Sequence, residues 1–278
     1  MSRDASTWDP RQYGEFADER SRAFFELLGR VGATEPASVA DLGCGSGELT
    51  AVLAERWPGA AVEGIDSSTE MIQAAGKYPR VTFTVGDLAE WAPDGPIDVI
   101  ISNAALHWVP THRELAARWV RTLSPGGWLA FQVPGNFGEP SHTILRELCT
   151  SPRWHDRLAG VTRWNPVGEP AEYLGLLAGL GCRVDAWETT YLQVLPGTDP
   201  VLEWVKGTAL RPVLTALDPA AATEFLTEYG ARLRQAYPAT PQGTVFPFRR
   251  IFVVAQRSHL QGHAAHQGPR AVGAERAQ

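Results

Sequence analysis

The sequence predicts an α/β fold: a Rossmann-like, mostly parallel seven-stranded sheet with helices on both faces. Between Val39 and Val133, short β-branched runs alternate with segments of helical spacing. That alternation is typical of parallel strands joined by helices. Two further strands are expected late in the chain, and the roughly fifty residues between them are too many for a hairpin loop. We interpret this segment as a helical cap inserted between the last two strands, over the binding edge of the sheet.

Composition limits the class of protein. The chain has 278 residues, a formal net charge of −6 and 44% hydrophobic residues, enough for one large domain with a sizeable core. A negative net charge disfavours nucleic acid, so we expect a small-molecule partner, with no nucleic acid and no obligate protein partner. The chain has no apolar run of about 18 residues and does not start like a secretory signal, so we expect a cytoplasmic protein without membrane contact.

Three scattered cysteines, Cys44, Cys149 and Cys182, fit neither a disulfide framework nor a metal site. We expect each to be a small buried apolar residue, and we expect no metal.

The elements are expected in the following order. Residues 8–28 form a helix with an apolar face, within an N-terminal helical segment (1–35) that lies over the active site. Strands follow at 37–42, 60–66, 81–87, 97–103 and 127–133. The first intervening helix places Leu49, Leu53 and Trp57 on one stripe. The second has Ser67 and Glu70 at capping-box spacing and ends at Gly76, and a third covers 111–123.

After Pro140 the pattern changes. Helices are expected at 142–149 and 171–181, a long strand at 183–195, helices at 199–217 and 220–237, and a last strand at 246–256. The expected domains are an α/β domain (36–195), a helical cap insert (196–244), the final strand of the sheet (245–257) and a disordered tail (258–278).

Three glycines mark the first binding feature. Gly43, Gly45 and Gly47 lie between an apolar strand and an amphipathic helix, where the absence of a Cβ lets a ligand approach the backbone. The carboxyl end of the first strand is where nucleotide-like ligands bind in open α/β sheets. Glu48 occupies the third glycine position of the dinucleotide fingerprint, which weakens a pyrophosphate interpretation.

Three acidic residues lie at or near strand ends. Asp41 precedes the glycines, Asp66 is spaced to accept hydrogen bonds from a ribose diol, and Asp87 ends the third strand. An acidic rim suits a ligand that has a ribose, an adenine and a positive centre but no phosphate. S-adenosylmethionine is that ligand.

Longer motifs carry a resemblance. The segments "DLGCGSG", "GIDSSTEMIQAA", "VGDL" and "SNAALHWV" resemble the class I S-adenosylmethionine-dependent methyltransferases. More narrowly, "WDPRQYGEFADERSR", "QVPGNFGEPSH" and "FPFRRIFVVA" resemble the trans-aconitate 2-methyltransferase family, from about Trp8 to Ala255. The resemblance implies methylation of one carboxylate of trans-aconitate. It also implies cofactor-binding roles for Asp41, Gly43, Gly45 and Gly47 at the methionine end, Asp66 at the ribose, Ser67 and Met71 beside the adenosine, Asp87 at the adenine, and Asn103 facing the methyl donor.

The chemistry of that reaction indicates which residue types to seek. A carboxylic acid is ionised at pH 7, so no general base is needed and none is assigned. The remaining carboxylates of a small polycarboxylate need a local basic grip, for which arginine is the matching residue. Strand alternation lets at most one of Arg249 and Arg250 face the site. The substrate-positioning candidates are Arg20, Arg22, Arg211, Arg249, Arg250 and His107, with Trp108 and Tyr13 as walls.

Two alternatives stay open. The enzyme could use the same cofactor to methylate an oxygen or carbon of another small molecule, which would require a nearby base and an apolar pocket. A non-catalytic regulatory module could also bind S-adenosylmethionine, although the intact glycines, Asp66 and Asp87 argue against it. The many arginines favour the carboxyl methyltransferase.

Overall fold

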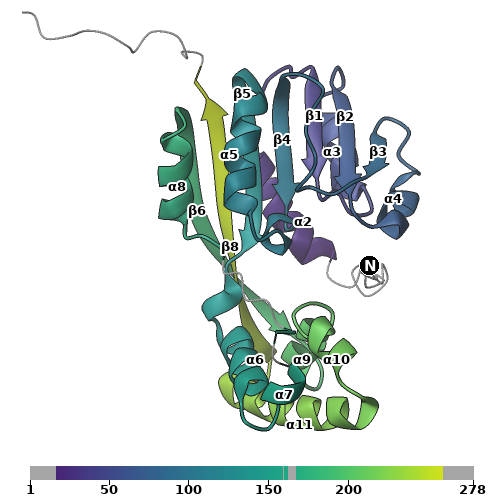
Figure 1. The fold of residues 1–278 in the computed structure, drawn as a ribbon, viewed down its shortest axis with the longest axis vertical. Helices are drawn as coiled ribbons and strands as arrows, with labels where there is room; N and C mark the ends of the chain where they lie inside the picture. Colours follow the sequence, from purple (N-terminus) through teal and green to yellow (C-terminus); the bar gives the residue numbers. More distant parts are fainter. Residues whose placement is uncertain (1–16, 159, 162–166, 259–278) are drawn as a thin grey trace, which may run out of the picture.

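The protein consists of two lobes joined by a pair of long strands. The structure is a computed structural model that describes residues 17–158, 160–161 and 167–258. Figure 1 shows a larger lobe built on the sheet and a smaller helical lobe, with β6 (Cys182–Leu195) and β8 (Gly243–Arg257) running from one into the other. Because β6 and β8 pair antiparallel along this length, a hydrogen-bonded two-stranded ribbon joins the lobes.

The sheet has the predicted architecture. Its order is β3-β2-β1-β4-β5-β8-β6, with β1 to β5 parallel and β8 antiparallel to both of its neighbours. A two-residue strand, β7 (Ala239–Thr240), also pairs with β8 and adds an eighth member. The parallel strands are β1 (Ser38–Leu42), β2 (Ala61–Asp66), β3 (Thr82–Val85), β4 (Ile97–Asn103) and β5 (Leu123–Pro134).

Helices cover both faces of the sheet. On one face α2 (Ala17–Leu28) and α3 (Glu48–Arg56) pack over a core that includes Val39, Ile101 and Phe252. On the other, α5 (His112–Thr122) and α8 (Pro170–Ala178) pack over a core that includes Ile100 and Phe131. A short helix, α4 (Thr69–Ala75), contacts β2 and β3. The central strands are buried on both sides, which explains their continuous apolar sequences.

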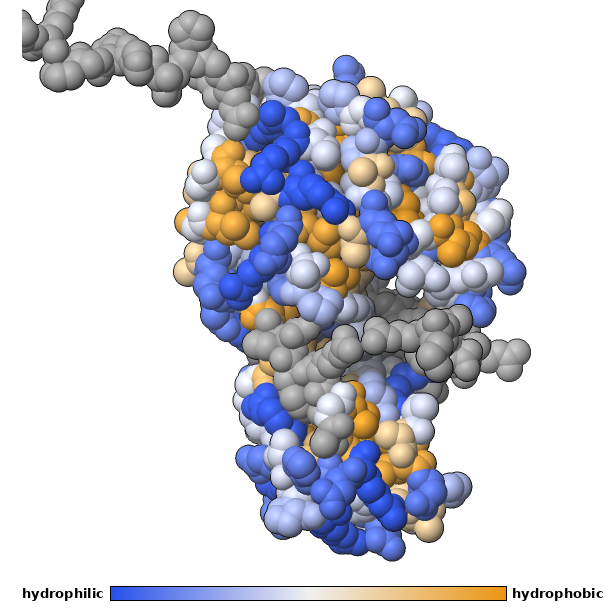
Figure 2. Space-filling model, in the orientation of Figure 1, coloured by the Kyte–Doolittle hydropathy of each residue, from blue (hydrophilic) through white to orange (hydrophobic). Residues whose placement is uncertain are grey.

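The helical lobe has a separate hydrophobic cluster around Phe225, Tyr229 and Phe246. The insert between β6 and β8 supplies α9 (Pro200–Lys206), α10 (Arg211–Ala216) and α11 (Pro219–Ala236). The same cluster includes residues of α6 (Pro140–Thr150) and α7 (His155–Leu158), which precede β6 in the chain. The lobe therefore combines the 196–244 insert with residues 140–158. In Figure 2 its outer end is hydrophilic, and hydrophobic residues show nearer the waist.

Cys44, Cys149 and Cys182 are free and buried, as expected. Among the residues that the structure describes, none of the helices is both long and apolar enough to cross a membrane.

Glu26 fixes α2 to the outer strand β6. Its carboxylate accepts hydrogen bonds from Trp187 Nε1 at 3.0 Å, Thr189 Oγ1 at 2.6 Å and Tyr191 Oη at 2.6 Å. Partial burial alone would raise the pKa of Glu26, but these three donors and the Arg22 charge outweigh burial and lower it. The ionised carboxylate is therefore the form that holds the helix.

We predict that Glu26→Ala destabilises the protein by about 2 kcal/mol, since three donors lose a charged acceptor. A lowered carboxyl pKa stabilises the fold above the unfolded value and loses that effect as the pH falls through the folded value. The difference from wild type should therefore shrink as the pH drops below 4.5. Denaturant unfolding at several pH values measures this. Glu55→Ala, at an exposed position on α3, is the control. An effect equal to that of the control would contradict the prediction.

Candidate functional site

The glycine loop between β1 and α3 has three left-handed residues. Gly43, Gly45 and Gly47 have φ values of +84°, +56° and +80°. A Cβ on Gly43 would lie 2.2 Å from the Ala105 side chain, and one on Gly47 would lie 2.7 Å from the Phe83 ring. A Cβ on Gly45 would have no atom within 4 Å. Packing inside the protein thus requires two of the glycines, while Gly45 leaves the backbone accessible to a ligand.

Asp66 holds this loop in place from the end of β2. Asp66 Oδ2 accepts a hydrogen bond from Gly45 N at 3.0 Å, and Oδ1 accepts one from Ser68 N at 2.9 Å. An ionised carboxylate has about four lone-pair positions, so a ribose diol can still donate to it. The helix cap differs from the prediction by one residue. Ser68, not Ser67, is the N-cap of α4, because the bond from Asp66 starts the turn there and Ser68 Oγ accepts from Met71 N at 3.2 Å.

Asp41 lies beneath the loop rather than on its surface. It is 2% exposed, and Asp41 Oδ2 accepts a hydrogen bond from Thr50 Oγ1 of α3 at 2.6 Å. Burial, together with the nearby Asp66 charge, raises the pKa of Asp41 from 3.8 to about 6. A cationic ligand would favour the ionised form of Asp41.

The remaining cofactor candidates are distributed around this edge. Asp87 is exposed after β3, and its Oδ1 accepts a hydrogen bond from Ala89 N at 2.8 Å. Ser67 is exposed between β2 and α4, and Met71 is buried on α4. All of them follow the carboxyl ends of β2 and β3, the edge that also carries the glycine loop after β1.

The carboxyl end of β4 lies next to the glycine loop. Asn103 ends the strand, and its Oδ1 is buried without a hydrogen-bond partner among the described residues. Ala104 follows with φ +55°, an unfavourable angle for a residue with a Cβ. Such strain is concentrated at ligand sites. Ala105 then contacts Gly43, so the loops after β1 and β4 touch.

Arg250 and Arg249 point to opposite faces of β8. Arg250 is 5% exposed, donates from Nη1 to Gln132 Oε1 at 3.3 Å and lies 4.4 Å from the centroid of the Phe248 ring. Gln132 is also the strand partner of Asn103. Gln132 therefore connects Arg250 to the residue that ends β4. Arg249 instead bonds Glu188 Oε2 at 3.1 Å and Glu169 Oε1 at 3.2 Å.

Arg249 also lines a cavity of about 480 Å³, with Arg146, Glu139 and Glu169 among its other lining residues. The hydrogen bonds that Arg249 donates to Glu169 and Glu188 raise the pKa of Arg249 above its ordinary value. Since its charge is matched by two carboxylates, Arg249 is a poor candidate for gripping an anion.

His107 follows β4 in the short helix η1 (Leu106–Trp108). Burial and the Arg250 charge, with smaller effects of His112 and His142, lower the pKa of His107 to about 3. The imidazole is therefore neutral at pH 7, and its Nδ1 is buried without a partner among the described residues. Trp108 is 57% exposed, and its ring centroid lies 4.7 Å from that of His107. The structure thus places His107 within the electrostatic range of Arg250.

Of the other predicted substrate residues, Arg22 lies beside Tyr191, on which the Arg250 charge also acts, Arg211 lies in the helical lobe, and two are wholly or partly outside the described part. Arg22 is exposed on α2, with its guanidinium 4.6 Å from the centroid of the Tyr191 ring. Arg211 begins α10 in the helical lobe and is half-buried. The backbone of Arg20 belongs to α2, but its side chain, like the whole of Tyr13, lies outside the described residues.

Three polar residues around this edge were not predicted as site residues: Gln132, Asn136 and His142. All three lie in "QVPGNFGEPSH", a motif used only for the family resemblance. Gln132 is completely buried and binds Arg250. Burial and the Arg146 charge lower the pKa of His142 to about 4. Asn136 is 1% exposed in the short helix η2 (Asn136–Gly138). The signal in the sequence that could have identified these three residues is the concentration of polar side chains at and after the end of an apolar strand.

Comparisons agree with this geometry. A "Methyltransferase domain" family matches residues 39–127. The YcgJ protein from Bacillus subtilis has a similar fold, with a TM-score of 0.55 at 14% identity, covering 84% of this chain and 97% of that one. Fold, glycine loop and acidic strand ends together define a class I methyltransferase, which uses S-adenosylmethionine as methyl donor.

Two relatives narrow the class. The trans-aconitate 2-methyltransferase of Streptomyces avermitilis is 53% identical over 261 residues, covering 90% of this chain and 97% of that protein. The enzyme of that name from Rhodococcus jostii is 54% identical over 252 residues, covering 90% and 99%. The chain belongs to the trans-aconitate 2-methyltransferase family.

The residues present fit S-adenosylmethionine. Gly45 leaves open space beside the loop, Asp66 retains acceptor capacity for a ribose, and Asn103 Oδ1 is a buried acceptor without a partner among the described residues. Asp41 and Asp66 provide negative charge that a sulfonium or ammonium group would neutralise.

We predict that Asp41→Asn flattens the pH dependence of stability. The native pKa is raised, so the stability of wild type falls as the pH rises from 3.8 to about 6. A shift of this size corresponds to about 3 kcal/mol. The variant keeps an acceptor for Thr50 but loses the titrating group. Unfolding measured from pH 4 to 7 tests this, with the exposed Asp156→Asn as control. Retention of the wild-type pH profile would show that Asp41 is not responsible.

Proposed function

We propose that the enzyme transfers a methyl group from S-adenosylmethionine to one carboxylate of trans-aconitate, forming a monomethyl ester. The observation that carries this proposal is the buried Arg250 beside His107 and the end of β4, in a protein of net charge −6. A buried guanidinium is a strong and directional partner for a carboxylate. The names of the relatives in Streptomyces avermitilis and Rhodococcus jostii support the same acceptor.

The chemistry asks for positioning rather than proton transfer. When bound, S-adenosylmethionine supplies an electrophilic methyl group on a positively charged sulfur. The acceptor carboxylate is already ionised at pH 7, so no residue has to remove a proton. Neutral His107 can donate one hydrogen bond to a carboxylate, but with a pKa of about 3 it does not serve as an acid near pH 7. Its role is to orient the acceptor.

Arg250 supplies the charge that makes the site selective for an anion. Its guanidinium lies between Gln132, which orients it, and the Phe248 ring, which shields one side. A spectator carboxylate held there would leave another carboxylate free to face the end of β4. Alignment of two reacting groups in a site that excludes water accounts for several kcal/mol of the barrier in enzymes of this kind.

The direct test uses purified protein, S-adenosylmethionine and trans-aconitate, with products identified by mass spectrometry. We expect S-adenosylhomocysteine and a product heavier by one methylene, with cis-aconitate and citrate much poorer acceptors. Turnover of phenols but not of polycarboxylates would reject the acceptor while keeping the methyltransferase. Tight cofactor binding without methyl transfer to any acceptor would instead support the non-catalytic alternative.

We predict that Arg250→Gln raises the KM for trans-aconitate by about 30-fold or more, the effect of losing about 2 kcal/mol from a buried charge pair. The KM for S-adenosylmethionine should change little. Arg249→Gln is a matched control, because it removes the neighbouring arginine from the opposite face of β8. Steady-state kinetics of wild type, Arg250→Gln and Arg249→Gln measure both KM values. Equal changes in both KM values for Arg250→Gln would remove Arg250 from the acceptor site.

A further inference from the structure

Asn136 is an unusual buried residue. Its side chain is 1% exposed, and both Oδ1 and Nδ2 lack a hydrogen-bond partner among the described residues. Leaving a buried polar group unpaired costs about 1–3 kcal/mol. Several other buried polar side chains are fully paired: Ser102 Oγ donates to Leu42 O at 2.7 Å, and both ring nitrogens of His112 have partners at 3.0 and 2.7 Å. The fold itself gives no reason to keep an amide at position 136.

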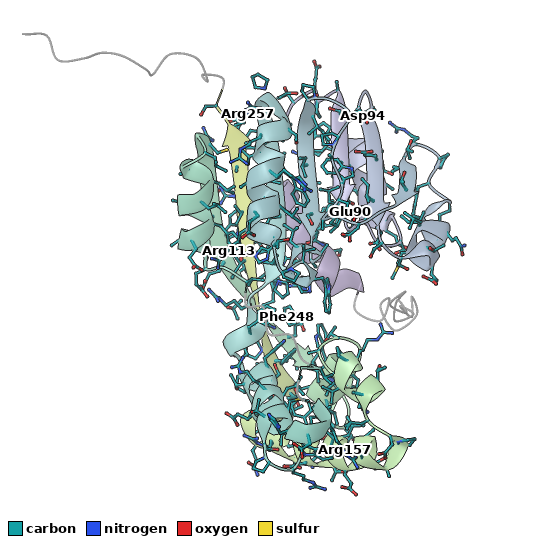
Figure 3. All side chains as sticks on the ribbon, in the orientation of Figure 1. Glu90, Asp94, Arg113, Arg157, Phe248 and Arg257 are labelled. Atoms are coloured by element: carbon teal, nitrogen blue, oxygen red, sulfur yellow. The ribbon has the colours of Figure 1, made fainter. Side chains whose placement is uncertain are left out.

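The position of Asn136 suggests a reason. Gly135 N donates to Arg249 O at 2.9 Å, which continues the pairing of Pro134 with Arg250 and places Asn136 beside the Phe248 end of β8. The two elements η2 and β8 are in contact. Figure 3 shows Phe248 at the waist between the lobes. The Arg250 guanidinium lies against that same ring at 4.4 Å.

Other buried atoms without partners gather in the same region. They belong to Asn103 at the end of β4, His107 in η1 and Gln132 in β5. Asn103 and Gln132 are strand partners, Gln132 binds Arg250, and the Arg250 charge acts on His107. A region with this many unsatisfied polar atoms is suited to a polar ligand that completes their hydrogen bonds.

We propose that Asn136 is a specificity-determining residue that binds a spectator carboxylate of the acceptor through Nδ2. This inference rests on the proposed function and names a contact beyond it. Arg250 supplies charge, which any carboxylate can satisfy. The neutral amide of Asn136 adds a directional donor at a second position, so an acceptor with one carboxylate too few leaves it unpaired. Rejection of such analogues is strong where a buried polar group loses its partner.

The test combines stability with ligand binding. Asn136→Leu replaces the amide with an apolar group of similar size, so the melting temperature should stay the same or rise. Affinity of the S-adenosylhomocysteine complex for trans-aconitate, measured by calorimetry, should fall about tenfold to hundredfold, while affinity for S-adenosylhomocysteine stays unchanged. Asn136→Asp keeps the shape and adds a negative charge, so it should weaken binding further. Gln256→Leu, at the far end of β8, is the matched control.

Truncated acceptors identify the contact. Removing one carboxylate of trans-aconitate gives cis-glutaconate, itaconate or mesaconate. For the analogue that lacks the carboxylate bound by Asn136, wild type and Asn136→Leu should have the same affinity, whereas the other two should bind the variant more weakly. Equal losses for all three analogues, or a parallel loss of trans-aconitate and S-adenosylhomocysteine affinity with a lower melting temperature, would overturn the proposal. Because binding is measured without turnover, failure of wild type to methylate trans-aconitate would count against the proposed function alone.

Discussion

The antiparallel pairing of β6 with β8 is the constraint on which both lobes depend. The pairing runs from Cys182 and Arg257 in the sheet to Leu195 and Thr244 in the helical lobe. On one face of β8, Phe252 belongs to the core under α2, while Phe246 belongs to the core of the helical lobe. Arg250 lies between these two anchored points. Since both ends of the strand are fixed in apolar cores, the depth and direction of this buried charge are fixed as well.

The two halves of the site have opposite electrostatic character. On the side of the glycine loop, Asp41 and Asp66 provide two carboxylates, and burial together with the Asp66 charge raises the pKa of Asp41. On the side of β8, the Arg250 charge and burial keep His107 neutral. A cationic methyl donor would offset the negative charge of Asp41 and Asp66, and an anionic acceptor would complement the positive charge of Arg250. Methyl transfer between such partners neutralises charge, and a dry site favours that change.

Polar groups without partners are not spread evenly through the described residues. Away from the waist, several buried polar side chains are satisfied locally, as Thr50 is by Asp41 and Ser102 by the backbone of Leu42, although Trp119 Nε1 and Gln193 Oε1 also lack partners among the described residues. At the waist, the side chains of Asn103, His107 and Asn136 keep unpaired atoms. Ala104 adds backbone strain at the same place. Unpaired buried polar atoms and backbone strain both cost stability, and such costs are typically found at functional sites.

The class of sheet, the glycine loop and the acidic strand ends could all be predicted from the amino-acid sequence. These follow from short-range pattern, because β-branched runs, glycines and strand-end carboxylates occupy fixed places relative to their own strand. Strand alternation also predicted that the side chains of Arg249 and Arg250 point to opposite faces of the sheet. Only the tertiary structure decided which of the two is buried, since that depends on Gln132 of β5 and on Glu169 and Glu188 from distant segments. The place of α6 in the helical lobe and the burial of Asn136 were likewise undetermined, because burial of a side chain depends on contacts between segments that the linear pattern does not specify.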